Sequence, residues 1–150
     1  MNMTPYNSNQ PPHGLARETI DYRQLLYYRV IGNIPREDVN LHACAHLYAS
    51  DRNSMFLVTN ALGIGDGFGR MASLSHTVVL HVGAEGLLMV DQKGDERWFC
   101  QEAWPERSGG GRGLHVSRLW DEMGVHVGST WQDGMVRLKK GENEKKGAKL

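Results

Sequence analysis

Residues 41–53 read Leu-His-Ala-Cys-Ala-His-Leu-Tyr-Ala-Ser-Asp-Arg-Asn, and this stretch decides how the 150-residue chain folds. At about 100° per residue it predicts a helix with one apolar stripe that would face a core. That stripe carries Leu41, Cys44, Ala45, Tyr48 and Met55. The opposite, polar face carries His42, His46, Ala49, Ser50 and Asn53.

Asp51 is the exception within this helix, because it falls on the apolar stripe. A carboxylate turned toward a core is costly unless it is paired, hydrogen-bonded or used in chemistry. A pair with Arg52, a hydrogen bond to the backbone and a catalytic role would each explain its position.

The composition describes an ordinary single domain with no net charge. The chain has 17 Lys and Arg residues and 17 Asp and Glu residues. This balance gives no electrostatic footprint for nucleic acid or for an anionic membrane surface. No apolar run is long enough to span a membrane, and no signal-peptide pattern starts the chain. We therefore expect a soluble, intracellular protein in which Cys44 and Cys100 are buried free thiols.

The order of the predicted elements indicates an α+β domain over residues 23–140. Residues 1–22 are expected to be a disordered or loosely attached leader, and residues 141–150 a charged tail. Acidic residues after Pro35 favour a helix start, and the helix is expected to continue to about Leu62. Strands are predicted at residues 25–31, 71–82, 87–90, 97–104, 112–120 and 125–138. One strand, one long helix and several strands predict an antiparallel sheet packed on a helix.

Four glycines at positions 63, 65, 67 and 69 invite comparison with a nucleotide-binding loop. The spacing does not fit a glycine-x-glycine-x-x-glycine motif, because Phe68 or Arg70 stands where the third glycine is needed. A flexible connection after the helix is the better interpretation.

Two later stretches extend the pattern of residues 41–53. They are Met-Ala-Ser-Leu-Ser-His-Thr at 71–77 and Gly-Ser-Thr-Trp-Gln-Asp-Gly-Met-Val-Arg at 128–137. Together, and in this order, the three stretches resemble the acyl-CoA thioesterase II family, the bacterial and peroxisomal acyl-CoA hydrolases built from hotdog domains. The likeness covers residues 27–138. It implies a hotdog fold, in which an antiparallel β-sheet wraps around a long central helix.

The resemblance also implies a catalytic set of Asp51, Ser73 and Gln132, which would hold a water molecule for hydrolysis of a thioester. The residue types suit this chemistry, because the carboxylate can take a proton and the hydroxyl and amide can orient the water. Taken singly, Ser73 and Gln132 would be unremarkable strand residues. The chain departs from the family at three positions. Members of the family often have threonine where this chain has Ser73, an acidic residue where it has Ser75, and glutamate where it has Asp133.

A glycine-arginine-glycine stretch of the family corresponds to Gly111, Arg112 and Gly113. Backbone N–H groups and a guanidinium are suited to CoA phosphates, so these residues are predicted to bind the substrate. A hairpin turn followed by an exposed arginine is the alternative interpretation. His76 also matches a family histidine, but we expect a hydrogen-bonded strand residue without a catalytic role.

Other chemistries compete with hydrolysis as explanations of the sequence. His42 and His46 are four residues apart, a spacing that can hold a metal, but no third ligand is evident, so no metal or cofactor is expected. Glu37 and His42 have the spacing of the acid and histidine in hotdog hydratases, although helix capping explains that region as well. A non-catalytic hotdog module that binds acyl-CoA or a partner is the main alternative function.

The resembled enzymes usually carry two hotdog units, and this chain matches only the second. One unit alone leaves a sheet edge uncovered, so we expect a homodimer with one continuous sheet. Residues 83–96 form an insertion that is either a loop over the substrate groove or tolerated surface. Ala148-Lys149-Leu150 resembles the peroxisomal address, which implies a peroxisomal import receptor as partner and a location in the peroxisomal matrix.

Overall fold

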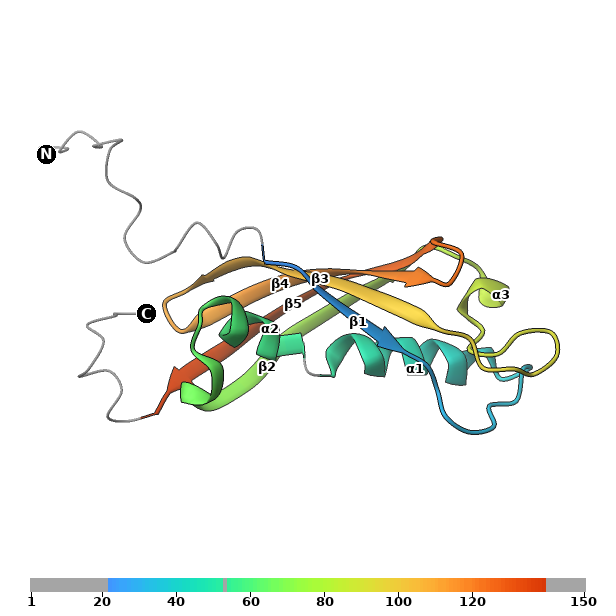
Figure 1. Cartoon of the computed structure of the whole chain (residues 1–150), viewed down its shortest axis with the longest axis horizontal. Coiled ribbons are helices and arrows are strands. Elements are labelled where there is room, and N and C mark those ends of the chain that lie inside the picture. Colours follow the sequence, from blue (N-terminus) through green and yellow to red (C-terminus); the bar gives the residue numbers. More distant parts are fainter. Residues whose placement is uncertain (1–21, 53, 140–150) are drawn as a thin grey trace, which may run out of the picture.

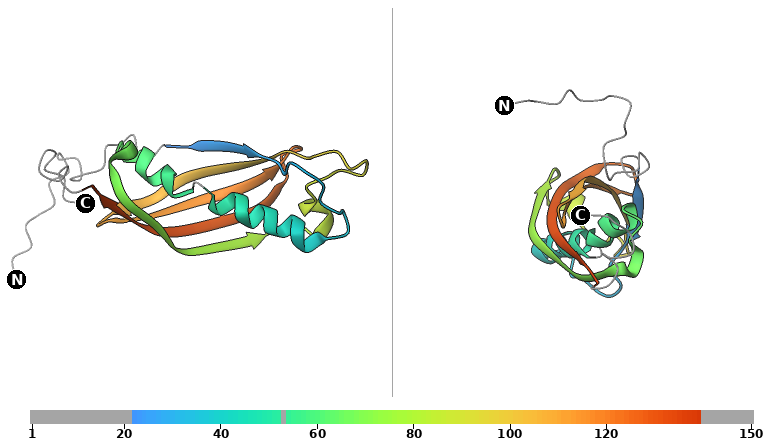
Figure 2. Two further views of the ribbon diagram at one scale, coloured as in Figure 1. Left: turned by 90° about the horizontal axis from the view of Figure 1, so that it is seen from below. Right: turned by 90° about the vertical axis from the view of Figure 1, so that its left-hand side faces the viewer.

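The computed structural model describes residues 22–52 and 54–139, which form one antiparallel sheet curled around two helices (Figures 1 and 2). The sheet order is β1-β3-β4-β5-β2. The strands are β1 (Gln24–Tyr28), β2 (Phe68–Leu80), β3 (Phe99–Gly109), β4 (Arg112–Asp121) and β5 (His126–Leu138). The helices are α1 (Val39–Asp51), α2 (Ser54–Ala61), the short α3 (Ala84–Leu87) and the 3-10 turn η2 (Gly65–Gly67). The expected α+β architecture is confirmed.

The predicted continuous helix to Leu62 is wrong, because α1 ends at Asp51 and α2 begins at Ser54. Arg52 leaves the helix with φ −61° and ψ 126°. The Ser54 hydroxyl donates to the Asp51 carbonyl at 2.6 Å. Serine and aspartate side chains that bond the local backbone favour helix ends over helix interiors. At the other end, the Asp38 side chain caps α1 by accepting from the Leu41 N–H at 3.1 Å, as the acidic start predicted.

The predicted orientation of α1 is also wrong, because its polar face is the buried one. His42 and His46 are fully buried, whereas Tyr48 on the apolar stripe is 67% exposed. His46 donates from Nε2 to the Leu87 carbonyl at 3.0 Å and accepts at Nδ1 from the Tyr28 hydroxyl at 2.8 Å. Each ring nitrogen is therefore satisfied in a neutral imidazole.

His42 is satisfied in the same way. Its Nε2 donates to the Pro35 carbonyl at 3.2 Å, and its Nδ1 accepts from the Met89 N–H at 3.0 Å. Burial of this face costs little because three backbone groups and the Tyr28 hydroxyl supply partners for the two rings.

The middle of the insertion at residues 83–96 is part of the core, while residues 83–85 and 92–95 are exposed. The predicted strand at 87–90 is absent from the described residues apart from a single bridge between Val90 and Glu96. Residues 87–90 are all buried. Met89 joins the main apolar cluster, whose other buried members are Ile34, Phe99, Leu119 and Val127. The insertion therefore closes the end of the core near the start of α1 (Figure 1).

A second, smaller apolar cluster lies under α2 and consists of Met55, Val58 and Val136. The junction between α1 and α2 carries the polar residues Asp51 and Ser54. The two clusters hold the two helices against the sheet, so the end of α1 is fixed from both sides.

Both cysteines are free, but Cys44 is exposed and Cys100 only half-buried, so the expectation of two buried thiols is wrong. In the described ranges no helix is long and apolar enough to cross a membrane. The leader expected at residues 1–22, apart from Tyr22, the tail expected at 141–150 and the tripeptide Ala148–Leu150 lie outside the described residues.

Acid is expected to destabilise the domain through His46. Burial lowers the pKa of His46 from 6.5 to about 4. Between these values the unfolded chain binds a proton that the folded protein excludes, so the free energy of unfolding should fall as the pH drops from 6.5 toward 4. For one histidine the slope is up to about 1.4 kcal/mol per pH unit.

Urea unfolding across this pH range measures the effect in the parent and in His46→Gln, whose amide does not titrate. The variant should be less stable at neutral pH and should lose less stability on acidification, by the slope of one proton. Parallel slopes for the two proteins would contradict a neutral, buried His46.

Candidate active site

The three residues predicted to be catalytic come from three elements and meet at one side-chain amide. Asp51 ends α1, Ser73 lies on β2 and Gln132 lies on β5. Gln132 Nε2 donates to Asp51 Oδ1 at 2.5 Å and to Ser73 Oγ at 2.6 Å. Gln132 is fully buried, while Asp51 and Ser73 are exposed. The buried amide thus holds two solvent-facing oxygen groups in one place.

Ser73 faces the helices because β2 contains a bulge. Ser73 pairs with Gly134, Ser75 with Asp133 and His76 with Gln132, which leaves Leu74 as the extra residue. Regular alternation would place residues 73 and 76 on opposite faces of the strand. The extra residue brings both onto the concave face, meaning the face of the sheet toward the helices.

Close packing of α2 on β4 and β5 brings the start of α2 up to Gln132. A Cβ at Gly134 would meet the Met55 side chain and the Ala72 carbonyl, and a Cβ at Gly113 would lie 2.6 Å from Val58 Cγ1. Glycine at these two positions lets the backbone of β4 and β5 approach α2 directly. Ser54, at the start of α2, reaches Gln132 Oε1 with its hydroxyl.

Two further histidines flank Gln132 on the concave face. His76 is opposite Gln132 on β2, and its Nε2 lies 3.3 Å from Ser50 Oγ, which confirms the expected hydrogen-bonded strand histidine. His115 is opposite Gln132 on β4 and is fully buried. Burial lowers the pKa of His115 to about 4, and the charges of His76 and Asp51 also act on it.

Sequence reasoning missed Ser54 and His115. On β4, polar His115 and Ser117 alternate with apolar Leu114 and Val116, a signal typical of a half-buried strand. That signal does not say which half is buried, and here the polar half faces the helices. Both α1 and β4 therefore bury polar side chains against the interior of the domain.

The residues predicted to bind substrate, Gly111, Arg112 and Gly113, are not brought together with Asp51. Gly111 has φ +73° in the β3–β4 turn, and its carbonyl accepts from Arg137 Nη1 at 2.9 Å. Arg112 forms an ion pair with Asp133, and this contact lowers the pKa of the Asp133 carboxyl. Asp133 and Gln132 are consecutive on β5 and therefore point to opposite faces, so Arg112 lies on the convex face. The contacts match a hairpin turn followed by an exposed arginine, and a role for these residues in binding CoA stays a prediction.

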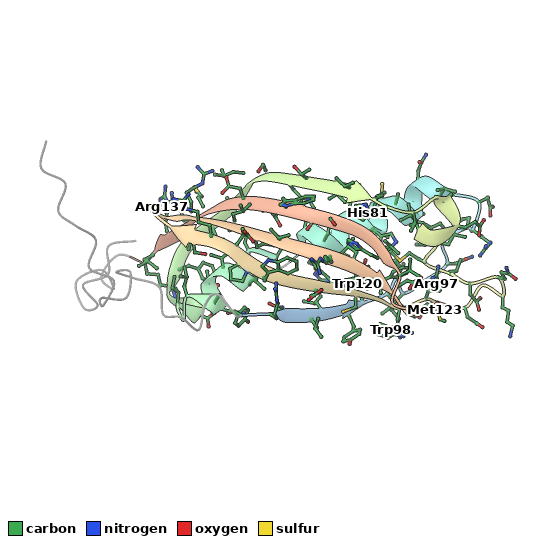
Figure 3. All side chains as sticks on the ribbon, turned by 90° about the horizontal axis from the view of Figure 1, so that it is seen from above. His81, Arg97, Trp98, Trp120, Met123 and Arg137 are labelled. Atoms are coloured by element: carbon green, nitrogen blue, oxygen red, sulfur yellow. The ribbon has the colours of Figure 1, made fainter. Side chains whose placement is uncertain are left out.

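Figure 3 shows the convex face, with labelled side chains at both ends of the sheet. Arg137 marks the end at the β3–β4 turn, and Arg97, Trp98 and Trp120 mark the other end, near the insertion. Arg97 joins the insertion to the sheet, because it donates to the Leu88 carbonyl at 3.0 Å and lies 3.3 Å from an Asp121 carboxylate oxygen. These contacts are structural and lie away from Asp51.

The alternative chemistries find no support in the geometry. Within the described ranges no cluster of three or more histidine, cysteine or acidic side chains could hold a metal. Both ring nitrogens of His42 are hydrogen-bonded to backbone groups, and the ring is fully buried. His42 therefore cannot act with Glu37 on a substrate in this arrangement.

A groove of about 580 Å³ runs between β1 and α1. Its lining is mainly apolar and includes Leu26, Tyr28, Ala45, Tyr48, Arg52 and Trp98. Arg52, the residue after Asp51, belongs to this lining, whereas Asp51, Ser73 and Gln132 do not. An apolar groove with a few polar groups at one end suits a hydrocarbon chain with a polar head.

Comparison with known proteins points to one family. Residues 8–136 match the family described as "Acyl-CoA thioesterase C-terminal domain". Acyl-coenzyme A thioesterase 8 of Mus musculus is 30% identical over 138 residues, which is 91% of this chain and 40% of that protein. The chain therefore spans about two fifths of the length of this relative.

Solved structures show the same fold. An acyl-CoA thioesterase II, TesB2, from Mycobacterium marinum superposes with a TM-score of 0.64 at 24% identity, covering 88% of this chain and 46% of that one. A hot-dog-like protein from Thermanaerovibrio acidaminovorans superposes with a TM-score of 0.51 at 12% identity, covering 84% of this chain and 88% of that one. The expected hotdog fold is confirmed.

Proposed function

Because the chain belongs to the family of acyl-CoA thioesterase C-terminal domains, we propose that it hydrolyses fatty acyl-CoA to a free fatty acid and CoA. The observation that carries this proposal is the Gln132 amide, which is hydrogen-bonded to both Asp51 and Ser73. A thioester hydrolase that acts without a covalent intermediate needs a base and a fixed water, and these three side chains supply such a set.

In the proposed reaction Asp51 takes a proton from a water molecule that Ser73 helps to orient. The water oxygen bonds to the thioester carbon, the carbon–sulfur bond breaks, and the CoA thiolate leaves. The proton held by Asp51 then passes to the thiolate, so the products are a fatty acid and the CoA thiol. Asp51 and Ser73 are exposed, which lets water and substrate reach them. The apolar groove beside Arg52 supports an acyl chain as the substrate's other part.

Release of free thiol from a series of short to long acyl-CoA substrates tests the proposed hydrolysis. Turnover of at least one chain length by the purified protein is expected. Binding of acyl-CoA without turnover would contradict it and would favour the second candidate, a non-catalytic acyl-CoA-binding or partner module. The groove lining, which does not include Asp51, Ser73 or Gln132, favours that candidate.

A homodimer is part of the proposal. Strand β2 is 13 residues long and pairs only with β5 among the described residues, so its outer edge is open. Leu74 on this strand is 53% exposed. A second copy that pairs along β2 would cover the edge and double the sheet. Light scattering should give about twice the chain mass of 16.8 kDa, and a monomer at micromolar concentration would refute the dimer.

The peroxisomal location and the import receptor also remain proposals. They rest on Ala148-Lys149-Leu150, whose likeness to a peroxisomal address is a matter of sequence alone.

A further inference from the structure

The hydrogen bonds around Gln132 leave one acceptor without a donor. Gln132 Nε2 has two hydrogens, and both are used, by Asp51 and Ser73. Among the described residues the hydrogen-bond partner of Gln132 Oε1 is the Ser54 hydroxyl. The same hydroxyl lies 2.6 Å from the Asp51 carbonyl. A hydroxyl has one hydrogen, so it cannot donate to both oxygens.

The Asp51 carbonyl is the favoured acceptor for that hydrogen. It belongs to the last residue of α1, where carbonyls lack a helical partner. If Ser54 donates there, Gln132 Oε1 faces only the lone pairs of the hydroxyl. The two ends of an amide have nearly the same shape, so Gln132 could then turn over and donate to Ser54. The turned amide would present its oxygen to Asp51 and Ser73, so the contact with the Asp51 carboxylate would be lost and Ser73 would have to donate its hydroxyl hydrogen to the amide.

His115, opposite Gln132 on β4, is a buried donor that has no partner in the described part of the chain. It is 0% exposed, and neither Nδ1 nor Nε2 has a hydrogen-bond partner in the described part of the chain. Its backbone pairs directly with that of Gln132, and both side chains lie on the concave face. Opposed residues on one face have Cβ atoms about 5 Å apart, within reach of an imidazole N–H for a neighbouring amide oxygen.

The surroundings keep the ring neutral, with one N–H to give. Burial lowers the pKa of His115 to about 4, so the ring carries a single N–H at neutral pH. The titratable groups that act on it are His76 on β2 and Asp51 on α1. Without a partner, a buried N–H of this kind would be a net cost to the fold.

We propose that His115 is a positioning residue: once its ring turns from the position in this structure, where neither nitrogen has a partner, it donates a ring N–H to Gln132 Oε1 and fixes the amide in the orientation that serves Asp51 and Ser73. This inference rests on the proposed hydrolysis for its kinetic consequence. Ser54 then donates to the Asp51 carbonyl, so both this carbonyl and Gln132 Oε1 have a donor. The role matters most when Asp51 takes a proton, because loss of its charge weakens its hold on the amide.

Kinetics of three variants test the inference. His115→Leu should lower kcat by about tenfold with KM little changed, because a hydrogen bond that orients the reacting groups is lost while substrate binding is not. His115→Asn, which keeps an N–H donor, should recover most of that loss. The matched control is Thr130→Val, which removes a buried hydroxyl on the same face that bonds Ser117 at 2.5 Å and does not contact Gln132, and it should keep the parental kcat.

A second readout does not depend on activity. The side-chain amide signals of Gln132 in a ¹⁵N-labelled protein should shift in His115→Leu and stay in place in Thr130→Val. A parental kcat, or an unshifted Gln132 amide signal, in His115→Leu would overturn the inference. If the parent releases no thiol, the proposed hydrolysis fails, and the amide signal alone decides the role of His115.

Discussion

Replacing Asp51 with asparagine is expected to lower kcat for acyl-CoA hydrolysis by about 100-fold or more, the scale of losing a positioned base. Asparagine is close to aspartate in size and retains an oxygen that can accept from Gln132 Nε2, as Asp51 Oδ1 does at 2.5 Å. The geometry should therefore survive while the basic group is lost. Free-thiol release with the most active acyl-CoA measures the change.

Asp66→Asn is the matched control, because Asp66 is an exposed acid in η2 that touches none of the three side chains. It should hydrolyse acyl-CoA at the parental rate. Equal urea midpoints for the two variants would show that the loss in Asp51→Asn is chemical. An Asp51→Asn protein with near-parental kcat would remove Asp51 from the reaction.

Gln132→Glu is expected to produce the second large effect, a loss of about 100-fold in kcat at neutral pH together with a changed pH profile. The new carboxylate would lie against Asp51, where the amide nitrogen now stands at 2.5 Å. Two carboxylates at this separation share a proton, and the pKa of one of them rises well above its usual range. An ionised glutamate also has no hydrogen to give to Ser73.

The sign of the pH effect follows from the shared proton. A raised pKa means that the pair loses its proton only at higher pH. The acid limb of the kcat/KM profile should therefore shift to higher pH than in the parent. Gln132→Met is the uncharged control. It should lose activity to a similar extent, because the donors to Asp51 and Ser73 are gone, but its acid limb should stay in the parental position. Identical pH profiles for the glutamate and methionine variants would refute direct contact between positions 51 and 132.

The residues of the site were accessible from sequence through family likeness, whereas their surroundings were not. Residues 41–53, 71–77 and 128–137 place Asp51, Ser73 and Gln132 in the family's order, and the structure brings their side chains together. The alternation of apolar and polar residues in a strand does not predict that Leu74 is a bulge residue without a partner on β5. The bulge depends on how β2 pairs with β5, which is a property of the whole sheet.

The reversed face of α1 has a similar explanation. A hydrophobic pattern ranks His42 and His46 as surface residues, because it assumes that polar groups find partners only in water. Here the partners are the carbonyls of Pro35 and Leu87, the N–H of Met89 and a tyrosine hydroxyl. Two of these backbone groups belong to the insertion, whose contribution to the core no local pattern could reveal. His115 escaped notice for the same reason, since the buried half of β4 is the polar half.

The bulge at Leu74 has a consequence for how this chain can change over evolutionary time. Just before the bulge the odd-numbered residues of β2 face the helices, and after it the even-numbered residues do. Ser73 lies before the bulge and His76 after it, and both side chains reach the concave face. A single-residue gain or loss inside this strand would turn one of them outward without disturbing the ladder as a whole. Lineages that carry the domain should therefore tolerate length changes in turns such as Gly109–Gly111 far more readily than in residues 73–76.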